Sequence, residues 1–265
     1  MTALALVTGA SSGLGAAFAA ELATRGRDLV LVARSGDRLD ALAGRLRGEH
    51  GVAAHVLVQD LAEPDAARRI GAGLAERGLQ VDLLVNNAGF GTCGRFEGIP
   101  GGRDREQLMV NVVAPVDLCH ELLPGMLARG GGSILNIAST AAFQPAPYFA
   151  VYGASKAFML DFSLALRQEY RGRGVRVTAV CPGPVETAFF DVIGTRKAAV
   201  TGAMTSPEHV VRASLRALDR DRAYVVPGLR NALGAHLTPT RPRGLIAAVA
   251  ERVTRPVLDG AGRAA

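Results

Sequence analysis

Seven short, almost continuously apolar runs alternate with helical patterns along most of this chain of 265 residues. They are rich in valine, leucine and alanine, which is typical of parallel strands covered on both faces. The runs lie at residues 4–8, 29–33, 53–58, 82–86, 133–138, 175–181 and 223–226. A strand, a helix and a second parallel strand form a right-handed crossover, so the alternation predicts an α/β fold. We expect a doubly wound, seven-stranded parallel sheet with helices on both faces.

Helical patterns fill the gaps between these runs, and the longest one covers residues 104–129. The others lie near residues 14–25, 36–48, 64–77, 152–171 and 207–219. A composition with 49% apolar and 20% charged residues suits a globular chain that buries a full core. Because no repeat or linker interrupts the pattern, we expect one domain over residues 1–226.

The last part of the chain, residues 227–265, differs from the rest because it is rich in proline, glycine and arginine. It contains one amphipathic stretch near residues 243–254, in which four apolar side chains share a helical face. They are Leu245, Ile246, Val249 and Val253. We expect this basic extension to pack on the same domain or on a neighbouring subunit. A helix lying on a membrane surface is the alternative.

The first apolar run leads directly into a glycine-rich turn, inside which a helical pattern begins. The turn consists of Thr8, Gly9, Ala10, Ser11, Ser12, Gly13, Leu14 and Gly15. Glycines permit a tight turn and a close approach to a pyrophosphate, and the free N–H groups of the next helix bind the anion. The spacing is GxxxGxG and not the commoner GxGxxG, but a plain turn does not need three glycines. The turn therefore predicts a dinucleotide site in a sheet of Rossmann type.

The end of the second apolar run bears on which dinucleotide binds. A site for NAD usually has an acidic residue there, which binds the ribose 2′-hydroxyl. This run is followed by Arg34, whose guanidinium suits a 2′-phosphate, and Arg38 and Ser11 are placed to assist. The alternative is that Arg34 is structural and that Asp37 serves an NAD site. We expect NADP(H) to be favoured over NAD(H).

A tyrosine and a lysine four positions apart, Tyr152 and Lys156, are expected on one face of a helix. Of the 30 lysine and arginine residues only two are lysines, the other being Lys197, so 28 are arginines. A lysine kept at this position indicates a role that needs a compact ammonium group. We expect the ammonium to lower the pKa of the tyrosine, which would make it a general acid or base. By itself the pair favours an ordinary solvated helix, but the other motifs reverse that preference.

In this order and at this spacing, the motifs resemble those of the short-chain dehydrogenase/reductase family. The resemblance covers residues 4 to about 226 and is specific because many modest motifs occur together. A Ser-Pro-Glu sequence at residues 206–208 and the basic tail make the chain most similar to a broad bacterial reductase subgroup. The further matches are Asp60, Leu61, Asn86, Asn87, Ala88, Gly89, Asn111, Ser139, Pro182, Gly183, Pro184, Val185, Glu186 and Thr187.

The resemblance implies how these residues contact the cofactor. Asp60 is expected at the adenine, next to Leu61, and the segment from Asn87 through Ala88 to Gly89 is expected on the ribose side. The nicotinamide carboxamide is expected at Val185 and Thr187, next to Pro182 and Gly183. Ser12 stands where NADP-dependent members of the family carry a basic residue, so one usual contact to the 2′-phosphate is absent.

The resemblance also implies reversible hydride transfer between nicotinamide C4 and a carbonyl or alcohol carbon. In reduction, Tyr152 would donate the proton and Ser139 would orient the carbonyl oxygen. Lys156 would also bind the ribose hydroxyls, and Asn111 would hold a water that links Lys156 to solvent. We expect an NADPH-dependent reductase of a ketone or 3-oxoacyl carbonyl. The alternatives are an NAD-dependent alcohol dehydrogenase and a non-catalytic nucleotide sensor, which has no need of all four residues.

Four phenylalanines flank the expected active-site segments, and they predict an apolar wall around the substrate. They are Phe143, Phe149, Phe189 and Phe190. We therefore expect an apolar or amphipathic ketone as the substrate, and not a small polar sugar. Residues 188–206 are expected to form a mobile lid with hinges at Gly194 and Gly202, or else a short, permanently packed helix.

Composition and charge argue against several other classes of protein. The net charge is +6, but arginines are scattered among acids, as at residues 103–106, which indicates a solvated surface and no nucleic-acid interface. Three cysteines without metal-ligand spacing predict no metal site and a reduced, cytoplasmic protein. No apolar stretch has the length of a membrane span, so no stable membrane insertion is expected. The resemblance implies a homotetramer or a homodimer built on the helices near residues 104–129 and 152–171.

Overall fold

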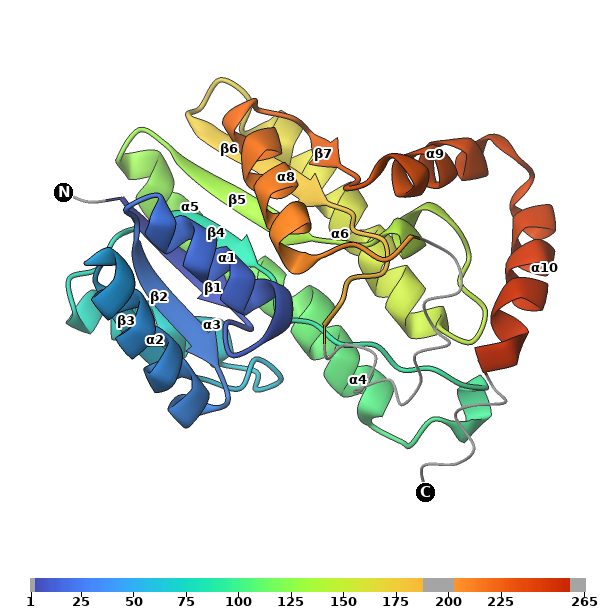
Figure 1. Cartoon of the computed structure of the whole chain (residues 1–265), viewed down its shortest axis with the longest axis horizontal. Helices are drawn as coiled ribbons and strands as arrows, with labels where there is room; N and C mark the ends of the chain where they lie inside the picture. The colour runs from blue at the N-terminus through green and yellow to red at the C-terminus, as the bar shows by residue number, and fades with distance from the viewer. Residues whose placement is uncertain (1–2, 188–202, 258–265) are drawn as a thin grey trace.

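The structure, a computed structural model, describes residues 3–187 and 203–257. Its centre is a parallel sheet of seven strands with helices on both faces (Figure 1). The strands are β1 (Leu4–Thr8), β2 (Asp28–Ala33), β3 (Ala54–Val58), β4 (Val81–Asn86), β5 (Gly132–Ile137), β6 (Val175–Val180) and β7 (Tyr224–Val225). Their order across the sheet is β3-β2-β1-β4-β5-β6-β7. The predicted fold class is confirmed.

Two apolar layers hold the helices on the sheet, because alternate residues of each strand point to opposite faces. Ala5 and Val7 of β1 belong to one layer, and Leu4 and Leu6 belong to the other. Three helices cover the first layer: α1 (Gly13–Thr24), α2 (Gly36–His50) and α8 (Pro207–Asp219). Three cover the second: α3 (Ala66–Glu76), α5 (Ala114–Ala128) and α6 (Ala150–Glu169). Each strand is therefore covered on both faces, and polar side chains gather at the strand ends.

The helix expected over residues 104–129 is interrupted, so that prediction was wrong in part. The segment consists of α4 (Arg103–Leu108), a π-helical turn over Met109–Val113, and α5. Pro115 has no N–H to donate to the carbonyl of Asn111, and its ring would crowd that carbonyl in a regular helix. The chain therefore widens by a π turn, which places Asn111 at the widened point.

The described part of the C-terminal extension contains two helices, α9 (Leu229–Leu237) and α10 (Arg243–Thr254). Short 3-10 turns lie at Thr238–Thr240 and Arg255–Val257, and elsewhere at Phe96–Gly98 and Thr140–Phe143. Figure 1 shows α9 and α10 at one end of the molecule, beyond β7 and α6. The Tyr148 hydroxyl donates to Glu251 at 2.5 Å, and Thr254 donates to the carbonyl of Pro147 at 3.3 Å. These bonds fasten α10 to the loop that precedes α6.

The extension buries only part of the expected apolar face. Ile246 is buried, whereas Leu245, Val249 and Val253 are exposed. The helix α9 was not predicted from the sequence. Within residues 3–187 and 203–257, no helix combines the length and the hydropathy that a bilayer crossing requires.

Candidate active site

The predicted site residues gather at the carboxyl edge of the sheet, where a cavity of about 1110 Å³ opens. The cavity extends from the glycine-rich turn after β1 to the helices of the C-terminal extension. The predicted residues that line it are Gly9, Ser11, Ser12, Gly13, Leu14, Arg34, Arg38, Asp60, Leu61, Asn87, Ala88, Gly89, Ser139, Tyr152, Lys156, Pro182, Gly183, Val185 and Thr187. Gly15 and Asn111 do not line the cavity, and they support it from behind.

The glycine-rich turn has a backbone that other residues could not adopt without strain. Gly9 and Gly13 have φ values of +65° and +54°, in the left-handed region. A Cβ on Gly15 would lie 2.2 Å from the carbonyl oxygen of Gly9, so the first turn of α1 packs directly on the loop. Ser12 precedes α1 and makes no side-chain cap bond to it. The turn presents a helix N-terminus to the cavity, and it fits a dinucleotide pyrophosphate.

Asn87 fixes this turn to the neighbouring strand end. Its side chain donates to the carbonyl of Thr8 at 2.8 Å, and its backbone N–H donates to the Thr8 hydroxyl at 2.9 Å. The N–H of Ala88 donates to the same hydroxyl at 3.0 Å. Because β1 and β4 are adjacent, these bonds hold the glycine-rich turn and the segment after β4 as one rigid floor.

Asn111 occupies the π-helical turn behind this floor and is buried. Its amide group donates to the carbonyl of Phe90 at 2.9 Å and to the Ser155 hydroxyl at 3.2 Å. Its side-chain oxygen accepts the N–H of Phe90 at 3.1 Å. A Cβ on Gly89 would lie 3.0 Å from Oδ1 of Asn111 and 3.3 Å from Nζ of Lys156. A side chain at position 89 would therefore crowd both Asn111 and Lys156.

Ser139, Tyr152 and Lys156 meet at the ends of β5 and α6. Ser139 follows β5, accepts the N–H of Ala141 at 3.1 Å, and hydrogen-bonds to the Tyr152 hydroxyl. Lys156 donates to the carbonyl of Ile137 at 2.9 Å. Its Nζ lies 5.8 Å from the centre of the Tyr152 ring. The hydroxyl of Tyr152 is therefore bonded to Ser139, and the ammonium of Lys156 lies near the Tyr152 ring at one wall of the cavity.

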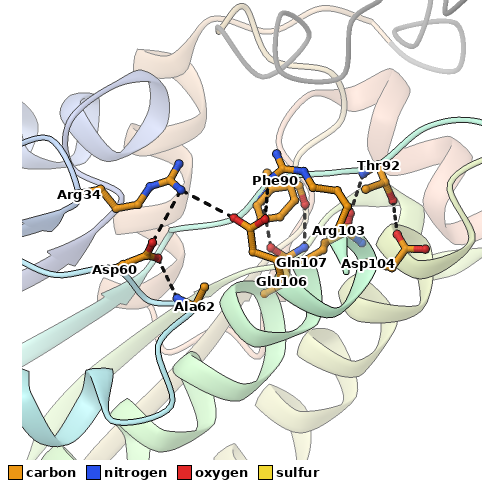
Figure 2. Close-up of polar contacts among 10 residues, drawn as sticks. Arg34, Asp60, Ala62, Phe90, Thr92, Arg103, Asp104, Glu106 and Gln107 are labelled. Atoms are coloured by element: carbon orange, nitrogen blue, oxygen red, sulfur yellow. Dashed lines mark hydrogen bonds and ion pairs between the residues drawn. The ribbon is translucent and has the colours of Figure 1, made fainter. Parts of the chain in front are cut away.

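At the far end of the cavity, Arg34 extends from the end of β2 between two carboxylates (Figure 2). Its Nη1 lies 3.9 Å from Oδ2 of Asp60 and 3.7 Å from Oε1 of Glu106. Asp60 is fixed because its other oxygen accepts the N–H of Ala62 at 2.9 Å. Arg38 lines the same end, whereas Asp37 does not.

A protein-family model described as short chain dehydrogenase matches residues 3–198. The chain belongs to the short-chain dehydrogenase family. The resemblance seen in the motifs is confirmed, and the protein is an oxidoreductase of this family.

Individual relatives extend the comparison. A very-long-chain 3-oxoacyl-CoA reductase of Anas platyrhynchos is 40% identical over 189 residues, which are 69% of this chain and 60% of that protein. The NADPH complex of a short-chain dehydrogenase from Sphingobium yanoikuyae is 35% identical with a TM-score of 0.81 and covers 92% of this chain and 95% of its own. A bulky-bulky ketone specific alcohol dehydrogenase from Comamonas testosteroni is 33% identical with a TM-score of 0.77. The match covers 92% of this chain and 94% of that chain. This chain therefore spans less than two thirds of the duck reductase.

Burial dominates the acid–base properties of the active site in this short-chain dehydrogenase. Desolvation raises the pKa of Tyr152, and the hydrogen bond with Ser139 offsets only part of that rise. Burial lowers the pKa of Lys156 to about 8, against a smaller opposing effect of Cys181. The expectation that the pKa of Tyr152 is lowered was wrong, because the spacing of two residues reveals proximity but not desolvation. A neutral tyrosine is the form that donates a proton.

The pKa of Lys156 sets an expected pH dependence. Below about pH 8 the side chain carries its charge, and in the expected role of Tyr152 as proton donor it would stabilise the resulting phenolate. Above that pH the charge is lost, so kcat/KM for NADPH in carbonyl reduction is expected to fall as pH rises through about 8. Initial rates between pH 6 and about 10 check this. A rate that is flat across this range would contradict the assignment.

The other end of the cavity is largely apolar, and the short-chain dehydrogenase builds it partly from its C-terminal extension, which also contributes Arg230 and Arg241. Phe143 and Phe149 line the cavity as predicted. The lining from α9 and α10 includes Leu237, Leu245, Ile246, Val249 and Val253. Phe189, Phe190, Gly194 and Gly202, with most of the expected lid, lie outside the described residues.

Some lining residues were missed in the sequence analysis. Arg103 and Glu106 were assigned to a solvated surface, yet both line the cavity, as does Val110. Their spacing of three and four positions places them on one helical face, which is a signal that the sequence contained. Phe90 also lines the cavity, directly after Gly89.

In the described residues, no three His, Cys, Asp or Glu side chains form a group suited to a metal.

Proposed function

We propose that this short-chain dehydrogenase is an NADPH-dependent carbonyl reductase that converts a ketone or a 3-oxoacyl group to a secondary alcohol. One observation carries the proposal. The buried Ser139 and Lys156 and the half-buried Tyr152 face one part of a continuous cavity, and Arg34 and Arg38 line another part of it. A nicotinamide dinucleotide supplies the hydride when it is bound along this cavity.

The chain's own residues supply the remaining chemistry. Ser139 fixes the carbonyl oxygen and donates to it as negative charge develops. Tyr152 gives that oxygen its proton, and its raised pKa keeps it protonated at neutral pH. Lys156 stabilises the resulting phenolate and would also bind the ribose of the nicotinamide. Asn111 positions Gly89 and Phe90 next to Lys156, and we keep the proposal that it holds a water there.

Three observations support NADP(H) over NAD(H). Arg34, Ser35 and Arg38 line the cavity after β2, whereas Asp37 is exposed and does not. A carboxylate that could bind a ribose 2′-hydroxyl is therefore missing from the position usual in NAD sites. The structure of the Sphingobium relative is described as a complex with NADPH.

Replacing Arg34 with alanine is expected to weaken NADPH binding by about 10- to 100-fold, because a charge-assisted bond to the 2′-phosphate is lost. NADH binding is expected to change less than about threefold, since NADH has a neutral hydroxyl at that position. Calorimetric titration of both cofactors into the native protein and the variant measures this. Equal losses for the two cofactors would assign Arg34 a structural role and favour the NAD-dependent alternative.

The apolar end of the cavity supports a bulky or long-chain substrate. Side chains on α9 and α10 form a wall beside the catalytic group, and Phe143 and Phe149 add aromatic surface. Two relatives are named for very-long-chain 3-oxoacyl-CoA and for bulky-bulky ketones. Burial of each further CH₂ group contributes about 0.8 kcal/mol, so affinity should rise with substrate chain length.

A ketone series tests this substrate class. With NADPH in excess, kcat/KM is expected to rise several-fold for each CH₂ pair added between short and long alkyl ketones. A polyhydroxylated sugar of similar size should react at least about 100-fold more slowly. The variant Val249→Asp places a charge on the apolar wall and should remove the dependence of kcat/KM on chain length. Val58→Asp, on the exposed end of β3 and outside the cavity, is the matched control and should keep that dependence. Equal activity on the sugar would overturn the proposed class.

The remaining parts of the proposal concern the state of the protein. We propose a homodimer or homotetramer, with residues 1–226 as the catalytic domain and residues 227–265 as a packed extension. Phe158 on α6 is exposed and stacks on Phe162 at 5.7 Å between ring centres, which suits a subunit interface. Three free cysteines suit a reducing, cytoplasmic location.

A further inference from the structure

We propose that Glu106 is a specificity-determining residue that weakens the binding of a 2′-phosphate by competing with it for Arg34. The inference rests on the proposed dinucleotide site. It assigns a role to an acidic side chain of α4 that lines the cavity beside Arg34 and that the reaction itself does not use. Its consequence is that discrimination between NADPH and NADH is smaller than Arg34 and Arg38 alone would give.

The geometry of this end of the cavity places Glu106 against Arg34 (Figure 2). Oε1 of Glu106 lies 3.7 Å from Nη1 of Arg34, slightly closer than Oδ2 of Asp60 at 3.9 Å. The Arg34 side chain is 68% exposed, so it is not packed in place and is free to change partners. A phosphate at Arg34 would therefore have to share or displace Glu106.

Glu106 is not a freely moving surface carboxylate. Its second oxygen accepts a hydrogen bond from Nη1 of Arg103 at 2.6 Å. The guanidinium of Arg103 lies over the ring of Phe90, 4.1 Å from the ring centre. The backbone of Phe90 is held on both its N–H and its C=O by Asn111. Glu106 is thus held at the cavity by a chain of contacts that ends at the π-helical turn.

The charges that face this end are few and nearly balanced. Arg34, Arg38 and Arg103 contribute three positive charges, and Asp60 and Glu106 contribute two negative charges. A 2′-phosphate brings nearly two further negative charges, whereas NADH has a neutral hydroxyl at that position. When a phosphate takes Glu106's place at Arg34, the attraction between Arg34 and Glu106 is given up, which at this range and partly screened by water corresponds to about a three- to tenfold loss of affinity. NADPH binding therefore loses affinity, whereas NADH binding does not.

The experiment is a calorimetric measurement of Kd for NADPH and NADH at fixed, low salt. The variants are Glu106→Gln, Arg34→Ala and the two combined. Glu106→Gln is expected to tighten NADPH binding about three- to tenfold and to leave NADH within twofold. In the Arg34→Ala background, the same change should have less than a twofold effect, because the competition has been removed.

A matched control separates local from overall charge. Glu49→Gln removes the same charge from an exposed pair with Arg45 on α2, outside the cavity, and it should leave both Kd values unchanged. The proposal is overturned if Glu106→Gln leaves the ratio of the NADPH and NADH Kd values unchanged or weakens NADPH binding. It is also overturned if Glu106→Gln changes the NADPH Kd by the same factor in the Arg34→Ala background. Failure of the native protein to bind NADPH would instead contradict the proposed function, so the two failures are distinguishable.

Discussion

Replacing Tyr152 with phenylalanine is expected to lower kcat for carbonyl reduction by about 1,000-fold, the range typical of losing a positioned general acid. The variant keeps the ring that packs beside Lys156 and loses only the hydroxyl that hydrogen-bonds to Ser139. NADPH affinity should stay within a few-fold, because the phosphate-binding end of the cavity is unchanged. Stopped-flow rates at saturating NADPH, with calorimetry alongside, measure both quantities.

Tyr148 provides the matched control for this variant. It lies four residues before Tyr152, in the loop that precedes α6, and its hydroxyl bonds to Glu251 of α10 instead of lying in the catalytic group. Tyr148→Phe therefore makes the same chemical change without removing the proton donor, and its kcat should fall less than about threefold. If Tyr152→Phe lost less than about tenfold in kcat, another group would have to supply the proton.

Replacing Lys156 with methionine is expected to abolish reduction while stabilising the fold. Activity should fall by about 1,000-fold, because the phenolate of Tyr152 loses its ammonium neighbour. The stability gain follows from the lowered pKa. A shift from 10.5 to about 8 means that burying the charged lysine costs about 3 kcal/mol. Subtracting about 1 kcal/mol for the hydrogen bond to Ile137 leaves the variant about 2 kcal/mol more stable at pH 7.

The pH dependence of this stability difference gives an independent test. Between about pH 8 and 10.5, the unfolded native chain binds a proton at Lys156 that the folded chain does not. The stability contributed by this group therefore rises with pH across that window, and the cost of burial is fully present below it. Urea unfolding at pH 7 and pH 10 should show the advantage of Lys156→Met shrinking at the higher pH. A constant difference would mean that Lys156 is not desolvated.

The strands could be predicted closely because a strand buried on both faces has a nearly continuous apolar sequence. All seven predicted runs overlap the observed strands, and β1 matches to the residue. The π-helical turn was missed because helical periodicity continues through it, although Pro115 marked the place. The helix α9 was missed for a different reason. Leu229 and Leu233 are exposed, so the helix shows no apolar face matched to a core.

The site could be located but not fully described from the sequence. Motifs that follow strand ends predicted the parts of the cavity lining near the glycine-rich turn and the catalytic group, since parallel strands bring their carboxyl ends to one edge. The spacing of Tyr152 and Lys156 gave their proximity but hid the burial that raises the pKa of one and lowers that of the other. Glu106 was assigned to a solvated surface because alternating charges on a short helix resemble one. The sequence does not show that Arg34, at the end of β2, lies beside it.

The central claim, that this chain transfers a hydride from NADPH to an apolar carbonyl, has one direct measurement. The native protein is incubated with NADPH deuterated at both C4 positions and a long-chain ketone or 3-oxoacyl thioester, and the alcohol is analysed by mass spectrometry. Our account predicts one deuterium on the carbinol carbon, with almost none formed by Tyr152→Phe. An alcohol without deuterium, or NADPH binding with no alcohol from any such substrate, would contradict it.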